Sequence, residues 1–362
     1  MAFNKNQHFV PKAHLRPFTH SREGRAINLL HVPSRKAVFG APVRNQCSGD
    51  YFYGQNAALE DAIQTVEGAY AKCVASLQAA PNSVSDLQEI QLKRFIYLQH
   101  VRTESSARHV AEYSSAITAM DPGIVPPPNT KELIKTGIIA AMRNYAESMD
   151  MVDDLRLRVL RNDTSVPFVT SDDPAVLLNR WHQARPQNRN ISFGVGSAGA
   201  VMFMPLTPEL AVVLFDGDIY SMEHSHFVTR IGRRSDIQAL NAIQALNCNM
   251  NLYFDDVGGA EHAQAAARLA EPHRPGKRLE VYYAVQAHTD GEFTRYDVTD
   301  TPDFNGHDNM LVHTLTMRTA PPAWPSVMRL KHRRSAYIDA SGRYLREAIA
   351  ARSGGQWRKV VL

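Results

Sequence analysis

Most of the helical pattern of this chain lies in one long stretch, with strand-like segments before and after it. Residues 56–79 place apolar side chains at i, i+4 and i+7 spacing, and two more helical segments extend the pattern to residue 153. The flanking segments are short, apolar or alternating, and turn residues separate them. This grouping predicts an α+β fold, in which a helical layer at about residues 56–153 packs on a mainly antiparallel sheet of N-terminal and central strands.

The chain also predicts where individual elements lie. We expect helices at 56–79, 86–119, 131–153 and 235–253, a proline-rich loop at 121–130, and strands at 26–32, 36–43, 155–160, 167–170, 200–205, 210–215, 279–286 and 311–317. The turn at 206–209 predicts a hairpin between its neighbouring strands. Composition shifts toward Pro, His, Asp and Arg after Pro272, so we expect a core domain at 1–270 and an extension at 271–362 with two strands and a basic tail.

The composition is that of a globular protein without membrane segments. Hydrophobic residues make up 44% of the chain and charged residues 21%, and no run of about eighteen apolar residues exists. The N-terminal residues lack the apolar core of a signal peptide. The three cysteines form no CxxC motif, which argues against a disulfide framework and a zinc ribbon. These features predict a reduced, cytoplasmic protein with no membrane partner.

Positive charge gathers at the C-terminal end. Residues 326–362 contain nine Lys or Arg and two Asp or Glu, a net charge of +7, whereas the whole chain carries +4. Tyr337, Tyr344 and Trp357 lie among these basic residues. This combination can contact nucleic acid or an acidic partner. The simpler alternative is a solvated C-terminal helix with a frayed end.

Arg102 occupies a position in the predicted 86–119 helix where an apolar residue is expected. At about 100° per residue, its side chain projects between those of Leu98 and Phe95, on the side of the helix that should be packed. A guanidinium group keeps its proton, so a buried one needs a carboxylate, phosphate or carbonyl partner. The sequence therefore predicts a polar site around Arg102.

Two candidate partners come from the helices themselves. Glu67 lies at the border of the apolar stripe of the 56–79 helix, which makes its carboxylate a natural partner for an inward arginine. Gln99 is three residues from Arg102 on the same helix, so both head groups can act on one group. His100 points away from Arg102 and is not included.

Two more candidates come from strand-like segments. Asp172 follows the 167–170 strand, where a carboxylate can serve a metal site or an acid–base site, or form an Asx turn. His8 lies in a segment that its prolines keep extended, and it can be a ligand, a base or a simple hydrogen-bonding group. The sequence contains no P-loop, no GxGxxG after a strand, no HExxH and no GxSxG, so none of these motifs defines the chemistry.

Six segments of the chain resemble, in the same order, a bacterial family known as domain of unknown function 4238. They are QHFVPKAHLRPF at 7–18, LED and VEG within 59–68, FIYLQHVRT at 95–103, PFVTSDDPAV at 167–176, PLTPELAVVL at 205–214, and LNAIQALNCNMNLYF at 240–254. The resemblance covers about residues 5–258 and brings no established activity. It implies a shared polar site, because several polar residues match recurring family positions. These residues are His8, Arg16, Glu67, Gln99, Arg102, Asp172 and Asn241.

The leading hypothesis is a hydrolase that acts on a phosphate-containing substrate, in its narrowest form a metal-dependent nuclease. The catalytic residues would be His8, Glu67, Arg102 and Asp172, and the substrate-binding residues Arg16, Gln99 and Asn241. Glu67 and Asp172 would hold a divalent cation such as Mg or Mn. The basic tail would help to bind nucleic acid.

Two alternatives remain open. In a non-catalytic binding or regulatory protein, Arg102 would form a buried ion pair with Glu67 or Asp172, and the basic tail would contact nucleic acid or an acidic partner. The chain can also be an enzyme for another small anionic substrate, such as a nucleotide or a carboxylate. An open cavity around Arg102 would favour an enzyme, whereas a closed, dry ion pair would disfavour it.

Overall fold

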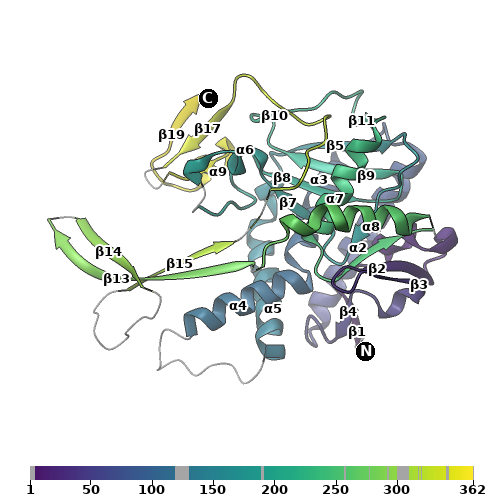
Figure 1. The fold of residues 1–362 in the computed structure, drawn as a ribbon, viewed down its shortest axis with the longest axis horizontal. Helices are drawn as coiled ribbons and strands as arrows, with labels where there is room; N and C mark the ends of the chain where they lie inside the picture. Colours follow the sequence, from purple (N-terminus) through teal and green to yellow (C-terminus); the bar gives the residue numbers. More distant parts are fainter. Residues whose placement is uncertain are drawn as a thin grey trace.

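The computed structural model shows an α+β protein, as the sequence predicts (Figure 1). The residues that it describes are 5–118, 130–188, 191–256, 258–276, 278–291, 293–299, 310–316, 318, 320–339 and 342–361. The proline-rich loop predicted at 121–130 therefore lies outside the described residues, apart from Thr130. Within those ranges, no helix has both the length and the hydrophobicity that crossing a membrane requires.

A five-stranded sheet forms the centre of the molecule. Its strands are β5 (Arg156–Asn162), β7 (Val176–Leu178), β8 (Val201–Pro205), β9 (Leu210–Phe215) and β11 (Val228–Ile231). The order is β11-β5-β9-β8-β7, and neighbours are antiparallel except for the parallel pair β11 and β5. The predicted hairpin between β8 and β9 is confirmed, with Met204 opposite Val212. Every residue of these two strands is buried, so both faces of the sheet are covered.

Helices of the predicted layer cover one face of this sheet, but the N-terminal strands that were predicted to belong to it lie in a separate sheet. The helices α2 (Ala57–Ala79) and α3 (Asp86–Val101) contribute Tyr70 and Phe95 to a core that also contains Leu157 of β5. The Tyr70 and Phe95 rings stack with their centroids 3.7 Å apart, which fixes the two helices against each other. Burial of the apolar stripe of each helix therefore forms this layer.

The opposite face packs against one later helix and part of the C-terminal region. Helix α7 (Arg234–Asn247) places Ile237 and Leu240 in a second core beside Phe203 of β8. Met328, which lies in the predicted extension at 271–362, belongs to the same core. Residues of the predicted extension thus bury apolar surface against the central sheet, and the domain boundary at 270 stays a prediction.

A second, smaller sheet joins the N-terminal part of the chain to the end of α7. Its order is β3-β2-β12-β6 and all its neighbours are antiparallel. Helix α8 (Gly259–Ala270) covers it with a row of alanines. The strands β2 and β3 match the predicted 26–32 and 36–43. The bounds are β2 Ala26–His31, β3 Lys36–Pro42, β6 Thr170–Ser171 and β12 Asn251–Phe254; the shorter elements are β1 Asn6–His8, β4 Ser48–Asp50, α1 Lys12–Leu15, α6 Arg180–Gln183, β10 Tyr220–Ser221 and β16 Arg329–Leu330.

The helix predicted at 86–119 is two helices. The first ends at Val101, where Arg102 leaves helical geometry, and α4 (Glu104–Thr118) begins two residues later. The Thr103 hydroxyl accepts a hydrogen bond from the backbone N–H of Ser106, so it caps the new helix. The break lets α4 turn away and pack against α5 (Thr130–Ser148) (Figure 1).

Two other helices end earlier than predicted. The helix expected at 235–253 stops at Asn247, and the remaining residues form β12, because the second sheet supplies backbone partners on both sides of that strand. The helix expected at 131–153 ends at Ser148, and a 3-10 turn over Met149–Val152 completes it.

The C-terminal region forms two small sheets. The predicted strands at 279–286 and 311–317 are present as β13 (Leu279–Asp290) and β15 (Met310–Thr316), and with β14 (Phe293–Thr299) they build an arm that projects from the body (Figure 1). The basic tail is not a frayed helix. It folds into a three-stranded sheet and a short helix, in which Arg346 is buried and binds Asp154. These elements are β17 Ser335–Ile338, β18 Tyr344–Leu345, α9 Glu347–Arg352 and β19 Arg358–Val361.

Candidate functional site

Arg102 is fully buried and is held by two of its predicted partners. Its Nη1 donates to Glu67 Oε1 at 2.8 Å, and its Nε donates to Gln99 Oε1 at 2.9 Å. The guanidinium carbon also lies 5.4 Å from the centroid of the Phe95 ring, a cation–π contact. Gln99 in turn donates from Nε2 to the carbonyl of Phe9 at 2.9 Å. The cluster therefore ties α2, α3 and the N-terminal segment together.

This arrangement favours a structural role for Arg102. The arginine side chain has no exposed surface, and its carboxylate partner belongs to a neighbouring helix of the same layer. Such a buried ion pair is costly to break, because removing one partner leaves the other desolvated. The guanidinium has no exposed surface, which disfavours an enzyme centred on Arg102, although its Nη2 is buried without a hydrogen-bond partner in the described part of the chain.

Three other predicted site residues lie elsewhere. Arg16 is exposed, and its Nε donates to the carbonyl of Arg22. His8 is half-buried in β1, and burial lowers its pKa. Asn241 is buried on α7, where Oδ1 accepts from the N–H of Val169 and Nδ2 donates to the carbonyl of Pro167. The Asn241 amide thus serves as a backbone partner for the segment before β6. The side-chain hydrogen bonds of Arg16 and Asn241 go to groups other than Arg102, whereas His8 precedes Phe9, whose carbonyl accepts from Gln99.

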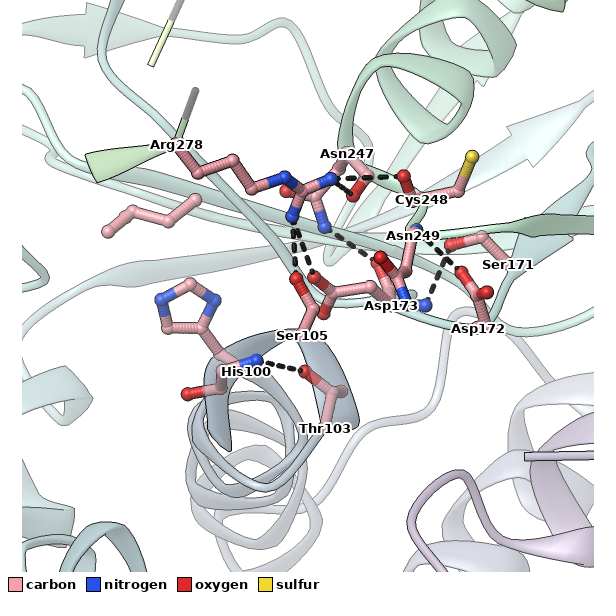
Figure 2. Close-up of polar contacts among 12 residues, drawn as sticks. His100, Thr103, Ser105, Ser171, Asp172, Asp173, Asn247, Cys248, Asn249 and Arg278 are labelled. Carbon is pink, nitrogen blue, oxygen red and sulfur yellow. Dashed lines mark hydrogen bonds and ion pairs between the residues drawn. The ribbon is translucent and has the colours of Figure 1, made fainter. Parts of the chain in front are cut away.

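Asp172 holds a turn together. Its carboxylate accepts hydrogen bonds from the backbone N–H groups of Asn249, Met250 and Asn251 at 2.8, 2.7 and 3.0 Å. Figure 2 shows Asn249 beside Asp172. Burial raises the pKa of Asp172, and the three N–H donors oppose that rise. The turn that it binds joins α7 to β12.

Glu67 and Asp172, the predicted metal pair, bind different partners in the structure. Glu67 binds Arg102, whereas both oxygens of Asp172 bind the 249–251 turn. Over the described ranges, no group of three or more His, Cys, Asp or Glu side chains has an arrangement that could hold a metal ion. The Asx turn that the sequence left open is a local bond to the backbone two residues on, whereas the bonds to Asp172 come from a distant turn.

A cavity of about 130 Å³ lies on the other side of the α3–α4 break, and we call it the Asp173 pocket. Elements distant in sequence meet there: the break itself, the segment after β6, the end of α7 and the base of the C-terminal arm (Figure 2). The polar residues that line it are His100, Ser105, Ser106, His109, Asp173, Gln183, Asn247, Arg278, Thr316 and Arg318.

Asp173 is the buried acid of this pocket. Its side chain is 6% exposed, and among the described residues Oδ1 has no hydrogen-bond partner. Its Oδ2 lies 3.8 Å from Nη1 of Arg278. Burial raises the pKa of Asp173 to about 6, although the positive charge of Arg278 works against this rise. The carboxyl group can therefore change its protonation state close to neutral pH.

Arg278 links three of the elements around the pocket. Its Nη1 donates to Ser105 Oγ at 2.6 Å, and its Nη2 donates to the carbonyls of Asn247 and Cys248 at 2.7 and 3.0 Å (Figure 2). The carbonyls belong to the end of α7, where a cation is favoured by the helix dipole. Arg278 thus anchors the base of the arm to α4 and α7.

Arg318 makes fewer hydrogen bonds than Arg278 does. Its Nη1 reaches the carbonyl of Leu177 at 3.4 Å, and its Nε is buried with no hydrogen-bond partner in the described part of the chain. The guanidinium lies 5.5 Å from the centroid of the Phe193 ring. Burial lowers the pKa of Arg318 to about 10, and Asp173 raises it in part, so the group stays positively charged at neutral pH.

Both histidines of the pocket are neutral at neutral pH. Burial lowers the pKa of His100 to about 3, and the charge of Arg318 lowers it further. Its Nδ1 donates to the carbonyl of Ala175 at 3.0 Å, so Nε2 is left as an acceptor. Burial also lowers the pKa of His109, and the charge of Arg318 lowers it further. Positive charge in the pocket therefore comes from the two arginines.

Sequence reasoning missed most of this pocket. Asp173 stands beside the predicted Asp172, and His100 was set aside because it points away from Arg102; that orientation is what carries it to the Asp173 pocket. Arg278 and Arg318 lie in the C-terminal region, which the resemblance does not cover. No local sequence pattern marks these two arginines, because their partners are distant in the chain. Arg278 binds Ser105 and Arg318 binds Leu177, each more than a hundred residues away.

Fold and site together define an α+β protein with a closed arginine–glutamate pair in its helical layer and a separate, arginine-lined pocket. The chain belongs to the DUF4238 family: the model described as "Protein of unknown function (DUF4238)" matches residues 6–257, as the resemblance predicts. No curated protein and no solved structure matches the chain. The family match includes Asp173 and His100, whereas Arg278 and Arg318 follow it in the sequence.

Proposed function

We propose that the Asp173 pocket binds the phosphate group of a small ligand. The observation that carries this proposal is the buried Nε of Arg318, which has no partner in the described part of the chain and belongs to a side chain that lines the pocket. Guanidinium groups bind phosphate oxygens through a planar fork, and an unpaired buried donor is costly unless a ligand or water bonds to it. Arg278 adds a second positive charge at the same wall.

The protonation of Asp173 sets the strength of this attraction. With its carboxyl group charged, the pocket carries the two arginine charges and one negative charge. When Asp173 takes up a proton, the negative charge disappears and the carboxyl group gains an O–H that can donate to a phosphate oxygen. Its pKa of about 6 makes this change accessible near neutral pH.

Hydrolysis of a phosphate ester in the pocket is the second candidate. A carboxyl group with a pKa of about 6 is suited to accept or give up a proton during such a reaction. The narrower form, a nuclease with a divalent cation such as Mg or Mn, would need a cation brought in with the substrate. The non-catalytic alternative, in which the basic tail contacts nucleic acid or an acidic partner, has weaker support, since Arg346 and Arg352 of the tail pair with Asp154 and Asp150 of the body.

A cytoplasmic location belongs to the same proposal. All three cysteines are buried free thiols, which is the usual state in a reducing compartment.

The test is calorimetric titration of the full chain with sulfate, which mimics phosphate and keeps its charge at neutral pH. We expect Arg318→Gln to weaken sulfate binding about tenfold or more, since it removes one charged donor. Arg268→Gln is the matched control, because Arg268 is exposed on α8 away from the pocket lining, and it should leave binding unchanged. Equal loss in both variants, or no binding of sulfate at millimolar concentration, would overturn the proposal.

A further inference from the structure

A second cavity adjoins the Asp173 pocket across the Arg318 side chain. It has a volume of about 210 Å³, and Gln183, Thr316 and Arg318 line both cavities. We call it the Asn188 chamber. Its remaining lining includes the Phe193 and His182 rings and Leu315, so apolar and aromatic surface forms much of its wall. A ligand held at Arg318 in one cavity can therefore extend into the other.

Two amide side chains in the chamber have fixed orientations. Gln183 Nε2 donates to the carbonyl of Arg318 at 2.8 Å, and Asn188 Nδ2 donates to the carbonyl of His182 at 3.3 Å. Exchanging O and N in either amide would place two oxygens against each other, so these contacts settle which atom is which. The amide oxygens are consequently the groups left over on both side chains.

Those two oxygens are buried without hydrogen-bond partners in the described part of the chain. They are Gln183 Oε1 and Asn188 Oδ1, and the Asn188 side chain is 4% exposed. An amide oxygen accepts hydrogen bonds and cannot donate them. Both residues line the chamber, so each brings an unpaired acceptor to its wall, whereas Arg318 between the two cavities brings positive charge.

We propose that the ligand is a nucleotide. Its phosphate group occupies the Asp173 pocket, and its base, a flat heterocycle with N–H donors, enters the Asn188 chamber and donates to Asn188 Oδ1 and Gln183 Oε1. This inference rests on the proposed phosphate site and adds that the rest of the ligand includes a base with N–H donors. The apolar side chains of Phe193 and Leu315 in the lining suit a heterocycle, which buries its faces and presents its donors at the edge.

The first test varies the ligand and leaves the protein intact. Calorimetry of the full chain compares AMP with purine riboside 5′-monophosphate, which lacks only the amino group, and with inorganic phosphate. We expect AMP to bind about tenfold or more tightly than the analogue, because a site built to accept a hydrogen bond discriminates strongly against a ligand without the donor. Ribose 5-phosphate is included to report on the sugar alone.

The second test varies the acceptor. Asn188→Leu should reduce AMP affinity to that of the amino-free analogue and leave inorganic phosphate binding unchanged, whereas Asn144→Leu, at an exposed position on α5, should change neither. Retained phosphate binding shows that the variant is folded. Should AMP bind no more tightly than inorganic phosphate, or ribose 5-phosphate equal AMP, the nucleotide assignment is wrong while the phosphate site stands. If neither phosphate nor AMP binds, both proposals fall.

Discussion

Arg102 donates to Glu67 across the interface of α3 and α2, and the two side chains differ sharply in their access to solvent: the arginine is 0% exposed and the glutamate 23%. A charge that keeps some contact with water loses less when its partner is removed than a charge that has none. The two halves of this ion pair are therefore unequal in what they cost to delete.

We expect Glu67→Leu to destabilise the protein more than Arg102→Leu does. The first change leaves a desolvated guanidinium without its carboxylate and should cost about 3–5 kcal/mol, whereas the second leaves a partly hydrated carboxylate and should cost less. Urea unfolding gives both values, and the double variant should recover part of the loss. Equal costs, or the opposite order, would contradict a closed pair of this kind.

Asp173 should make folding stability depend on pH in a defined window. Its pKa is about 6 in the folded protein, compared with about 3.9 in an unfolded chain, so the folded state binds the proton more tightly. This contribution is fully present below about pH 4 and disappears as pH rises through about 6, a loss on the order of 2–3 kcal/mol. Asp173→Asn should remove this pH dependence. The measurement is the free energy of unfolding of both proteins as a function of pH, and an equal pH dependence in the two would rule out the assignment to Asp173.

Sulfate binding should depend on the same titration of Asp173, with tighter binding at lower pH. Lowering the pH from about 8 to about 5 protonates Asp173 and removes the one negative charge of the pocket, so sulfate should bind more tightly by up to about tenfold. The Asp173→Asn variant should bind sulfate with an affinity that no longer varies over this range. Calorimetry at several pH values checks both, and an unchanged pH dependence in the variant would place the titrating group elsewhere.

His14 should cause part of the loss of stability in acid. It is fully buried between the Tyr70 hydroxyl and the Thr170 hydroxyl, each 2.8 Å from a ring nitrogen, and burial lowers its pKa to about 3. Because an unfolded histidine has a pKa of about 6.5, the stabilisation is complete above that value and is lost as pH falls toward 3, about 2 kcal/mol by about pH 5. His14→Gln should reduce this loss, whereas the same change at exposed His20 should not. Thermal unfolding against pH is the measurement.

The closed Arg102 cluster was predictable because its geometry is largely local. Arg102 and Gln99 are one turn apart, and Glu67 lies on the adjacent helix, whose apolar stripe fixes which side faces inward. The break after α3 was not predictable from periodicity, since the apolar pattern continues through it. The capping hydroxyl of Thr103 and the packing of α4 on α5 decided it.

The role of Asp172 shows where sequence reasoning reached its limit. A carboxylate at a strand end is equally suited to a metal, a proton or a turn, and the sequence left all three open. The three N–H groups that occupy it come from the 249–251 turn, which lies nearly eighty residues away. The approach of α7 and β12 to the segment after β6 brought these N–H groups to Asp172, and this long-range role is none of the three options.

Sequence alone determined the fold class, most of the helices and strands, the family and the inward arginine, with Glu67 and Gln99 among its candidate partners. These depend on side-chain periodicity and on contacts within one turn or between adjacent helices, which short segments encode directly. The Asp173 pocket was decided by tertiary structure, because Arg278 and Arg318 reach Asp173 only when the C-terminal arm packs beside α4 and the end of α7. Its chemistry depends on burial, which turns an ordinary carboxyl group into one that titrates near pH 6.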